Sequence, residues 1–193
     1  MIKCDRCGRE ISKDDSYKYE GQTLCKECFA NDEKITAMRD EATGQTLQKL
    51  LPLNDTISLV VTGHLLVEYW LDQLIKLRTP YPKKLFKSAR LQFSQKLYLA
   101  ESLGLLIDEY SKGIRILNNI RNHLSHDLEY QISKEELSAL QASVSFLSSE
   151  DQSTVDKLDS PKEELIFFCI SFAGYARGYA LGYARSIKKR RRD

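Results

Sequence analysis

The sequence has no excess of charge of one sign and no long low-complexity segment. Its formal net charge is only +2 over 193 residues. The C-terminal run Lys188–Asp193 carries a net charge of +4, so the rest of the chain carries −2. Basic charge is therefore concentrated at the C-terminus. This distribution excludes a nucleic-acid-binding field that extends over the whole protein.

Other absences narrow the class of protein further. No signal peptide is visible at the N-terminus, so we expect a cytoplasmic protein. Disorder is excluded, because 42% of the residues are hydrophobic, which is enough apolar material for one real core. Length and composition together allow one or two folded domains.

Cysteine is scarce but strongly patterned. Four of the five cysteines form two Cys-x-x-Cys pairs separated by 17 residues, namely Cys4, Cys7, Cys25 and Cys28. The spacing is typical of four-thiolate zinc sites and favours metal in a reducing cytosol over a disulfide scaffold or a redox pair. We predict one structural Zn²⁺ per chain bound by these four thiolates. Four protein ligands leave no open position for a catalytic water.

The segment between the cysteine pairs predicts a β-hairpin. Residues 17–19 and 22–24 flank Glu20-Gly21, a turn signal that would return the second pair to the first. A helix is expected from Phe29 to about Ala42, so that knuckle, hairpin and helix resemble a treble-clef or half-LIM zinc finger. We call residues 1–42 the finger. It is too small to bury a core, and zinc would supply on the order of 10 kcal/mol of its folding free energy.

The remaining chain predicts a helical bundle over residues 54–187, with a basic tail at 188–193. Thr43-Gly44-Gln45 is expected to interrupt the finger helix, so residues 43–53 are interpreted as a linker or short helix. Periodicity and two capping boxes, at Ser133 and Ser160, predict the helices that follow. They are expected at 55–78, 83–90, 91–103, 108–127, from 133 and at 161–190, with a polar loop at 148–159. The fold class is therefore mostly α, with a small zinc-bound β-hairpin and helix in front.

The last predicted helix is unusually apolar. Residues 165–184 contain one charge, Arg177, and glycines at 174, 178 and 182. Small residues at every fourth position allow another helix to approach closely. The length matches a membrane span, but Arg177 near its centre would cost about 2.5–3.5 kcal/mol on an insertion scale. We interpret the segment as a buried bundle helix, or one shared across a dimer, with Cys169 as an inert core thiol. A membrane anchor is the alternative.

A polar cluster at Arg121–His126 is the candidate site of the bundle. It is the only place where a cation, an amide and two of the three histidines fall within six residues. A buried stripe carries it, formed by Ile114, Leu117, Ile120 and Leu124. A second, polar face contains Arg115, Asn119, Asn122 and His126.

The two ends of this cluster do not lie on one line of the helix. Arg121 and His126 are about 140° apart around an ideal helix of 3.6 residues per turn. Both reach one phosphate only if the arginine side chain swings toward the histidine, or if a second copy of the helix completes the site. This geometry predicts a symmetric homodimer.

The form Arg-Asn-x-x-x-His at 121–126 resembles the signature of HEPN domains, all-helical modules found in many RNA-cleaving toxins and defence proteins. The resemblance extends to Gly63–Tyr69, Phe93–Leu97 and Leu103–Leu106, covers roughly residues 53–185 and looks like the branch with mannitol-operon-repressor-type proteins. It implies a metal-independent endoribonuclease that acts as a toxin or a defence enzyme. His126 would then transfer protons, Arg121 would stabilise charge on the phosphate, and Asn122 would hold His126 or a phosphate oxygen.

A line of polar residues on the 55–78 helix has two interpretations. His64, Glu68, Asp72 and Lys76 follow one another every four residues, which is typical of a solvated face. The resemblance supports the alternative of a site, because a carboxylate such as Glu68 could orient a histidine across the bundle.

Two functions stay open on the sequence. The first is the endoribonuclease, with RNA as substrate and an antitoxin or other protein as a further partner. The second is a non-catalytic, dimeric HEPN-like regulator whose finger recruits protein or nucleic acid, the polar cluster at 121–126 then only closing a helix end. The intact Arg121, Asn122 and His126 favour the nuclease. No small-molecule cofactor is expected.

Overall fold

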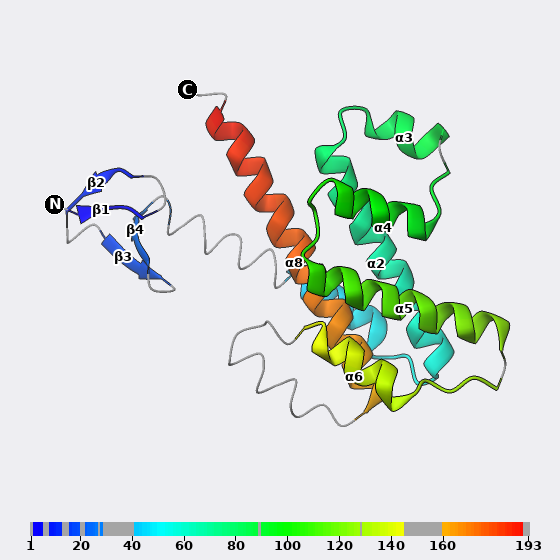
Figure 1. The fold of residues 1–193 in the computed structure, drawn as a ribbon. Helices are drawn as coiled ribbons and strands as arrows, with labels where there is room; N and C mark the ends of the chain where they lie inside the picture. The colour runs from blue at the N-terminus through cyan, green and yellow to red at the C-terminus, as the bar shows by residue number, and fades with distance from the viewer. Residues whose placement is uncertain are drawn as a thin grey trace.

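The computed structural model describes residues 2–5, 8–12, 16–19, 22–26, 28, 41–88, 90–127, 129–144 and 160–190. Most of these residues are helical, and the strands are confined to the N-terminal segment (Figure 1). The mostly α fold class is therefore confirmed.

The N-terminal segment contains two short antiparallel strand pairs. Strand β1 (Ile2–Lys3) pairs with β2 (Glu10–Ile11), and β3 (Ser16–Tyr19) pairs with β4 (Gln22–Cys25). In the second pair Tyr19 lies opposite Gln22, which confirms the predicted hairpin. Residues 29–40 of the helix predicted from Phe29 to about Ala42 lie outside the described residues. The N-terminal segment has a small hydrophobic cluster separate from the core of the bundle. The buried members of this cluster are Cys4, Ile11, Leu24 and Cys25.

The predicted interruption at Thr43-Gly44-Gln45 is wrong, because residues 41–50 are continuously helical, whereas the interpretation of 43–53 as a short helix is confirmed as far as residue 50. Ala42, Thr46 and Leu50 are buried at spacings of four, and Leu50 belongs to the core of the bundle. The threonine hydroxyl donates to the carbonyl oxygen of Ala42 (2.9 Å), which satisfies it inside the helix. One glycine in a helix costs only about 1 kcal/mol, and burial of this apolar face outweighs that cost.

The bundle begins with α2 (Thr56–Arg78), followed by α3 (Pro82–Ser88) and α4 (Phe93–Ser102). Asp55 caps α2, since its Oδ1 accepts a hydrogen bond from the Ser58 amide (2.7 Å). The chain reverses after α4 at Gly104, whose φ of +64° is readily adopted only by glycine. The three helices therefore start and end close to the positions predicted for them.

The second half of the bundle contains α5 (Asp108–His126), α6 (Lys134–Ala142) and α8 (Pro161–Arg190). Both predicted capping serines lie at their expected helix starts. Ser133 Oγ accepts from the Glu136 amide (3.1 Å), and Ser160 Oγ accepts from the Glu163 amide (3.3 Å). The predicted loop at 148–159 lies outside the described residues.

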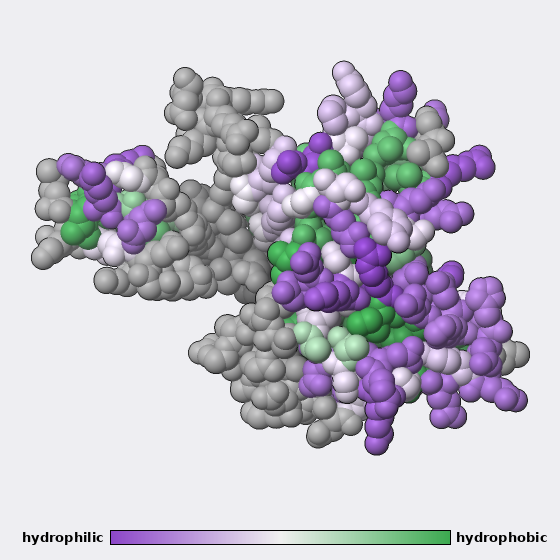
Figure 2. Space-filling view, viewed as in Figure 1, coloured by the Kyte–Doolittle hydropathy of each residue, from purple (hydrophilic) through white to green (hydrophobic). Residues whose placement is uncertain are grey.

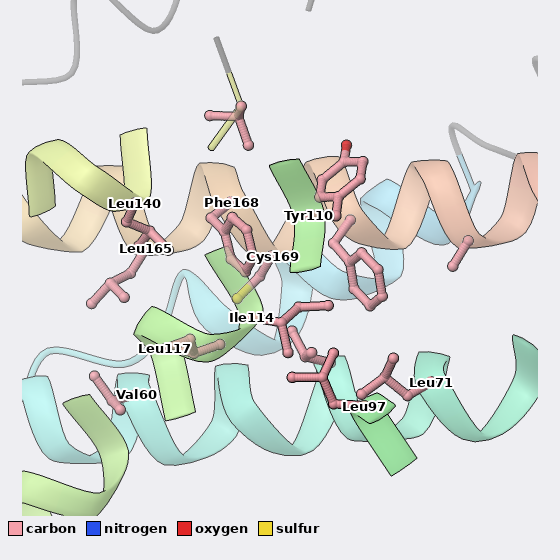
Figure 3. Packing of buried hydrophobic residues seen from close by; sticks show 14 of the residues in the cluster. Val60, Leu71, Leu97, Tyr110, Ile114, Leu117, Leu140, Leu165, Phe168 and Cys169 are labelled. Atoms are coloured by element: carbon pink, nitrogen blue, oxygen red, sulfur yellow. The ribbon is translucent and has the colours of Figure 1, made fainter. Parts of the chain in front are cut away.

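The core lies where α2, α4, α5 and α8 meet (Figure 3). Two glycines permit this close packing. A Cβ atom added to Gly63 of α2 would lie 2.9 Å from the Cys169 Sγ atom of α8, and one added to Gly113 of α5 would collide with the ring of Phe168 and the hydroxyl of Ser143. These contacts set how closely α2 and α5 approach α8. Burial raises the pKa of Cys169 to about 12, so this core thiol stays protonated.

Helix α8 has one segment, Pro161–Tyr183, that is long and apolar enough by length and composition to cross a membrane. Its N-terminal half packs in the core of the bundle, where Leu165, Phe168 and Phe172 are almost fully buried. Gly174 lies against the helix at 41–50, since a Cβ there would be 3.4 Å from Thr43 Oγ1. The interpretation as a buried bundle helix is confirmed for this half.

Candidate functional site

A solvent-open cavity of about 500 Å³ lies between α2, α5 and the start of α4. Its lining is mainly polar, and comprises His64, Glu68, Gln92, Phe93, Ser94, Asn118, Arg121 and Asn122. Among these are a histidine, a cation and two asparagines, which together offer both hydrogen-bond donors and a titratable base. The cavity is thus large and polar enough to admit a small charged group.

Helical periodicity explains why these residues meet. His64 and Glu68 are four apart on α2, while Asn118, Arg121 and Asn122 lie three and four apart on α5, so each helix contributes one face. The N-terminal turn of α4 closes the third side. Local spacing produces each half of the site, and packing of the helices joins the halves.

His64 is held firmly in the wall of the cavity. Only 6% of the residue is exposed, its Nε2 atom lies 3.1 Å from Asn118 Oδ1, and its ring lies 3.9 Å from that of Phe93 between centroids. Burial lowers the pKa of His64 below its usual 6.5, and the positive charge of Arg121 lowers it further. The Asn118 hydrogen bond and the charge of Glu68 oppose this shift without reversing it. The imidazole is therefore neutral near pH 7.

Arg121 offers an exposed cation to the cavity. Its Nη1 atom donates to Asn122 Oδ1 (3.1 Å), which orients both side chains. Within the part of the chain that the structure describes, no carboxylate forms an ion pair with this guanidinium. The remaining donors of the guanidinium fork are thus available to an anionic ligand.

Lys96 of α4 differs from Arg121, because two carboxylates of α2 neutralise it. Its Nζ atom lies 2.7 Å from Glu68 and 2.9 Å from Asp72. Burial opposes the charged form of Lys96, but the hydrogen bonds with both carboxylates outweigh burial and raise its pKa. The predicted solvated face of α2 is therefore wrong. His64 is buried there, and Glu68 and Asp72 bind α4, because the face packs against a helix whose lysine complements it.

The three motif residues do not all reach the cavity. Arg121 and Asn122 line it, whereas His126 is the last residue of α5, is exposed and is absent from the lining. Hydrophilic residues gather over this end of α5, at the right of Figure 2. The arginine and histidine of the motif are thus separated within one chain, as their spacing predicts.

The second polar face predicted on α5 divides in the same way. Arg115 is bound by both oxygens of Glu101 (2.6 Å each), and Asn119 is exposed. Sequence reasoning missed Asn118 as a partner of His64, although its spacing of three and four from the motif residues Arg121 and Asn122 was a usable signal.

The chain matches no protein-family model, no curated protein and no solved structure. Its function must therefore be argued from the chemistry of its own sites.

The predicted metal site is present in outline in the finger. The Sγ atoms of Cys4, Cys25 and Cys28 lie within 4.8 Å of one another, close enough to hold a metal ion. Sulfur atoms bound tetrahedrally at about 2.3 Å would be separated by about 3.8 Å, so the donor set fits. Cys7, the fourth predicted ligand, lies outside the described residues. Gly8, directly after it, has a φ of +72°, which allows the tight turn that returns the chain past Cys4.

The surroundings of these thiols also suit a metal. Cys4 and Cys25 are buried, and the Cys25 amide donates a hydrogen bond to Cys4 Sγ (3.3 Å). Such donors stabilise the thiolate form, which is the form that binds metal.

Proposed function

We propose that this chain is a metal-independent endoribonuclease that acts in the cavity between α2, α4 and α5. One observation carries the proposal: an arginine free of carboxylate partners among the described residues shares an open cavity with two asparagines and a neutral histidine. A phosphodiester needs these groups, namely a cation for its charge, amide donors for its oxygens and a base for the attacking hydroxyl.

In the proposed reaction the ribose 2′-hydroxyl attacks the neighbouring phosphorus atom. A 2′-oxygen to phosphorus bond forms and the bond to the 5′-oxygen breaks, which leaves a cyclic phosphate and a 5′-hydroxyl. Arg121 stabilises the charge that develops on the non-bridging oxygens, and Asn122 holds the guanidinium in place. No step of this scheme asks for a metal.

The resemblance to HEPN domains supports the same conclusion, because the matching Arg121 and Asn122 are the motif residues that line the cavity. On this proposal the protein is a cytoplasmic toxin or defence nuclease, controlled by an antitoxin or another protein partner. The zinc finger, with Zn²⁺ bound by Cys4, Cys7, Cys25 and Cys28, is then a structural module for partner or RNA binding.

A cleavage assay with purified protein and total RNA tests the proposal. Arg121→Ala should reduce cleavage by about 10²–10³-fold, the range for loss of one group that stabilises transition-state charge. Lys112→Ala removes an equal charge from an exposed position of the same helix outside the cavity, and should cleave like the wild type. Chelation should leave cleavage intact unless it acts through the finger. Cleavage at the wild-type rate by both Arg121→Ala and Lys112→Ala would assign the activity to a contaminant.

A non-catalytic function at the same cavity is the second candidate. It is favoured by one observation, the exposure of His126 at a distance from the lining. Wild-type protein that binds RNA through Arg121 without cutting it would support this regulator instead.

We propose a second copy of the chain as the partner of the exposed side of α2. Four large apolar residues recur there every four positions and are 39–58% exposed, namely Ile57, Val61, Leu65 and Tyr69. Such a line is self-complementary under a two-fold rotation and marks an interaction surface. Light scattering should report about twice 22.2 kDa, and Leu65→Glu should give monomers. A monomeric wild type would refute the dimer.

A further inference from the structure

We propose that His64, and not His126, is the histidine that transfers the proton in this site. The inference rests on the proposed nuclease function and assigns its base to a residue of α2, outside the Arg-Asn-x-x-x-His motif. It follows from placement: His64 shares the cavity with Arg121 and Asn122, whereas His126 ends α5 in solvent.

The hydrogen bond with Asn118 orients the His64 ring. The Asn118 oxygen accepts, so Nε2 carries the proton and donates it across 3.1 Å. In the neutral ring the lone pair then lies on Nδ1, which is the basic atom. Phe93 stacks on the ring at 3.9 Å and restricts its rotation. Asn118 and Phe93 are thus positioning residues for a base.

Charges around His64 favour its basic form. Arg121 faces it from α5 and disfavours a second positive charge, while Glu68 on α2 acts in the opposite direction. On α4 the nearest cation, Lys96, is neutralised by Glu68 and Asp72, and Phe93 is uncharged. His64 can therefore accept a proton at neutral pH.

The proton balance of the step is complete. Nδ1 of His64 takes the proton of the 2′-hydroxyl as the new phosphorus–oxygen bond forms. The 5′-oxygen takes a proton from water as its bond to phosphorus breaks, and the imidazolium later returns its proton to solvent. His64 touches the reacting hydroxyl in this scheme, so it is a catalytic residue.

Matched glutamine variants of the two histidines test the assignment. His64→Gln keeps an amide that can bond Asn118 but has no basic nitrogen, and should lower kcat by about 10²–10⁴-fold. Its RNA affinity, measured by fluorescence anisotropy, should change little because Arg121 remains. His126→Gln should cleave like the wild type. Loss of activity in His126→Gln with retention in His64→Gln would overturn the assignment and leave the nuclease proposal standing.

A pH profile gives a readout that does not depend on the folding of a His64 variant. Activity should fall as the pH decreases through the pKa of the base. Glu68→Gln removes a charge that raises the pKa of His64, so it should move this acidic limb to lower pH. Asn119→Ala, an exposed neighbour of Asn118, should not move it. An acidic limb that stays in place in Glu68→Gln would overturn the role of His64. Wild-type protein that binds RNA without cleaving it would overturn the nuclease proposal and this inference together.

Discussion

Four buried residues form the described core of the finger, and two of them are cysteines, whereas 22 buried residues form the described core of the helical bundle. The finger also brings the thiols of Cys4, Cys25 and Cys28 within 4.8 Å of one another, close enough to hold a metal ion, and a bound metal can supply folding free energy that a small core does not. The described core of the bundle is apolar throughout. The comparison explains why the thiolate site is proposed as structural, while the candidate chemistry lies in a cavity that the packed helices hold open.

The largest expected effect is loss of the finger when its ligands are removed. Cys25→Ser should lose zinc and unfold the finger alone, because metal binding contributes on the order of 10 kcal/mol there. Cys169→Ala is the matched control, since that thiol lies in the bundle core and should leave the zinc content unchanged. Elemental analysis with circular dichroism would measure both. A full zinc complement in Cys25→Ser would show that the thiols do not form this site.

A second change should affect the bundle and spare the finger. Gly113→Ala adds a methyl group against Phe168 and Ser143, and this overpacking should lower the free energy of unfolding by about 1–3 kcal/mol. The higher helix propensity of alanine should offset about 1 kcal/mol of that loss. The same substitution at Gly182 meets no atom of the described residues within 4 Å and should be neutral or slightly stabilising. Thermal unfolding of the two variants would separate the effect of side-chain packing on stability from the effect of helix propensity. Equal melting temperatures would contradict the tight α5–α8 contact.

The smallest expected effect is a pH dependence of the bundle alone. Burial raises the pKa of Glu136, but hydrogen bonds from the Tyr130 hydroxyl (2.5 Å) and from Ser133 outweigh burial, so the folded-state pKa lies below 4.5. The stabilisation is therefore present above the unfolded-state value and is lost as the pH falls through the folded-state pKa. Glu136→Gln should flatten the fall of the melting temperature below about pH 4.5. Glu135→Gln, at an exposed position, leaves the hydrogen bonds of Glu136 with Tyr130 and Ser133 in place and should keep the wild-type slope.

Local signals were sufficient for most helices. Ser133 and Ser160 cap the helices that their positions predicted, because a capping side chain bonds backbone amides only two or three residues away. The same local reasoning failed at Gly44. A breaker was visible in the sequence there, but burial of Ala42, Thr46 and Leu50 against the bundle was not.

The candidate site shows the same division. The sequence by itself determined the spacing of the cysteine pairs, the helical frame of α5 and the separation of about 140° between Arg121 and His126 around it, since these depend on chain periodicity alone. Only the tertiary structure decided which histidine joins Arg121 and Asn122 at the cavity. His64 and Asn118 are 54 residues apart, and they meet because α2 and α5 pack directly against each other. Contacts over that separation depend on the fit of side chains between helices, which no local pattern encodes.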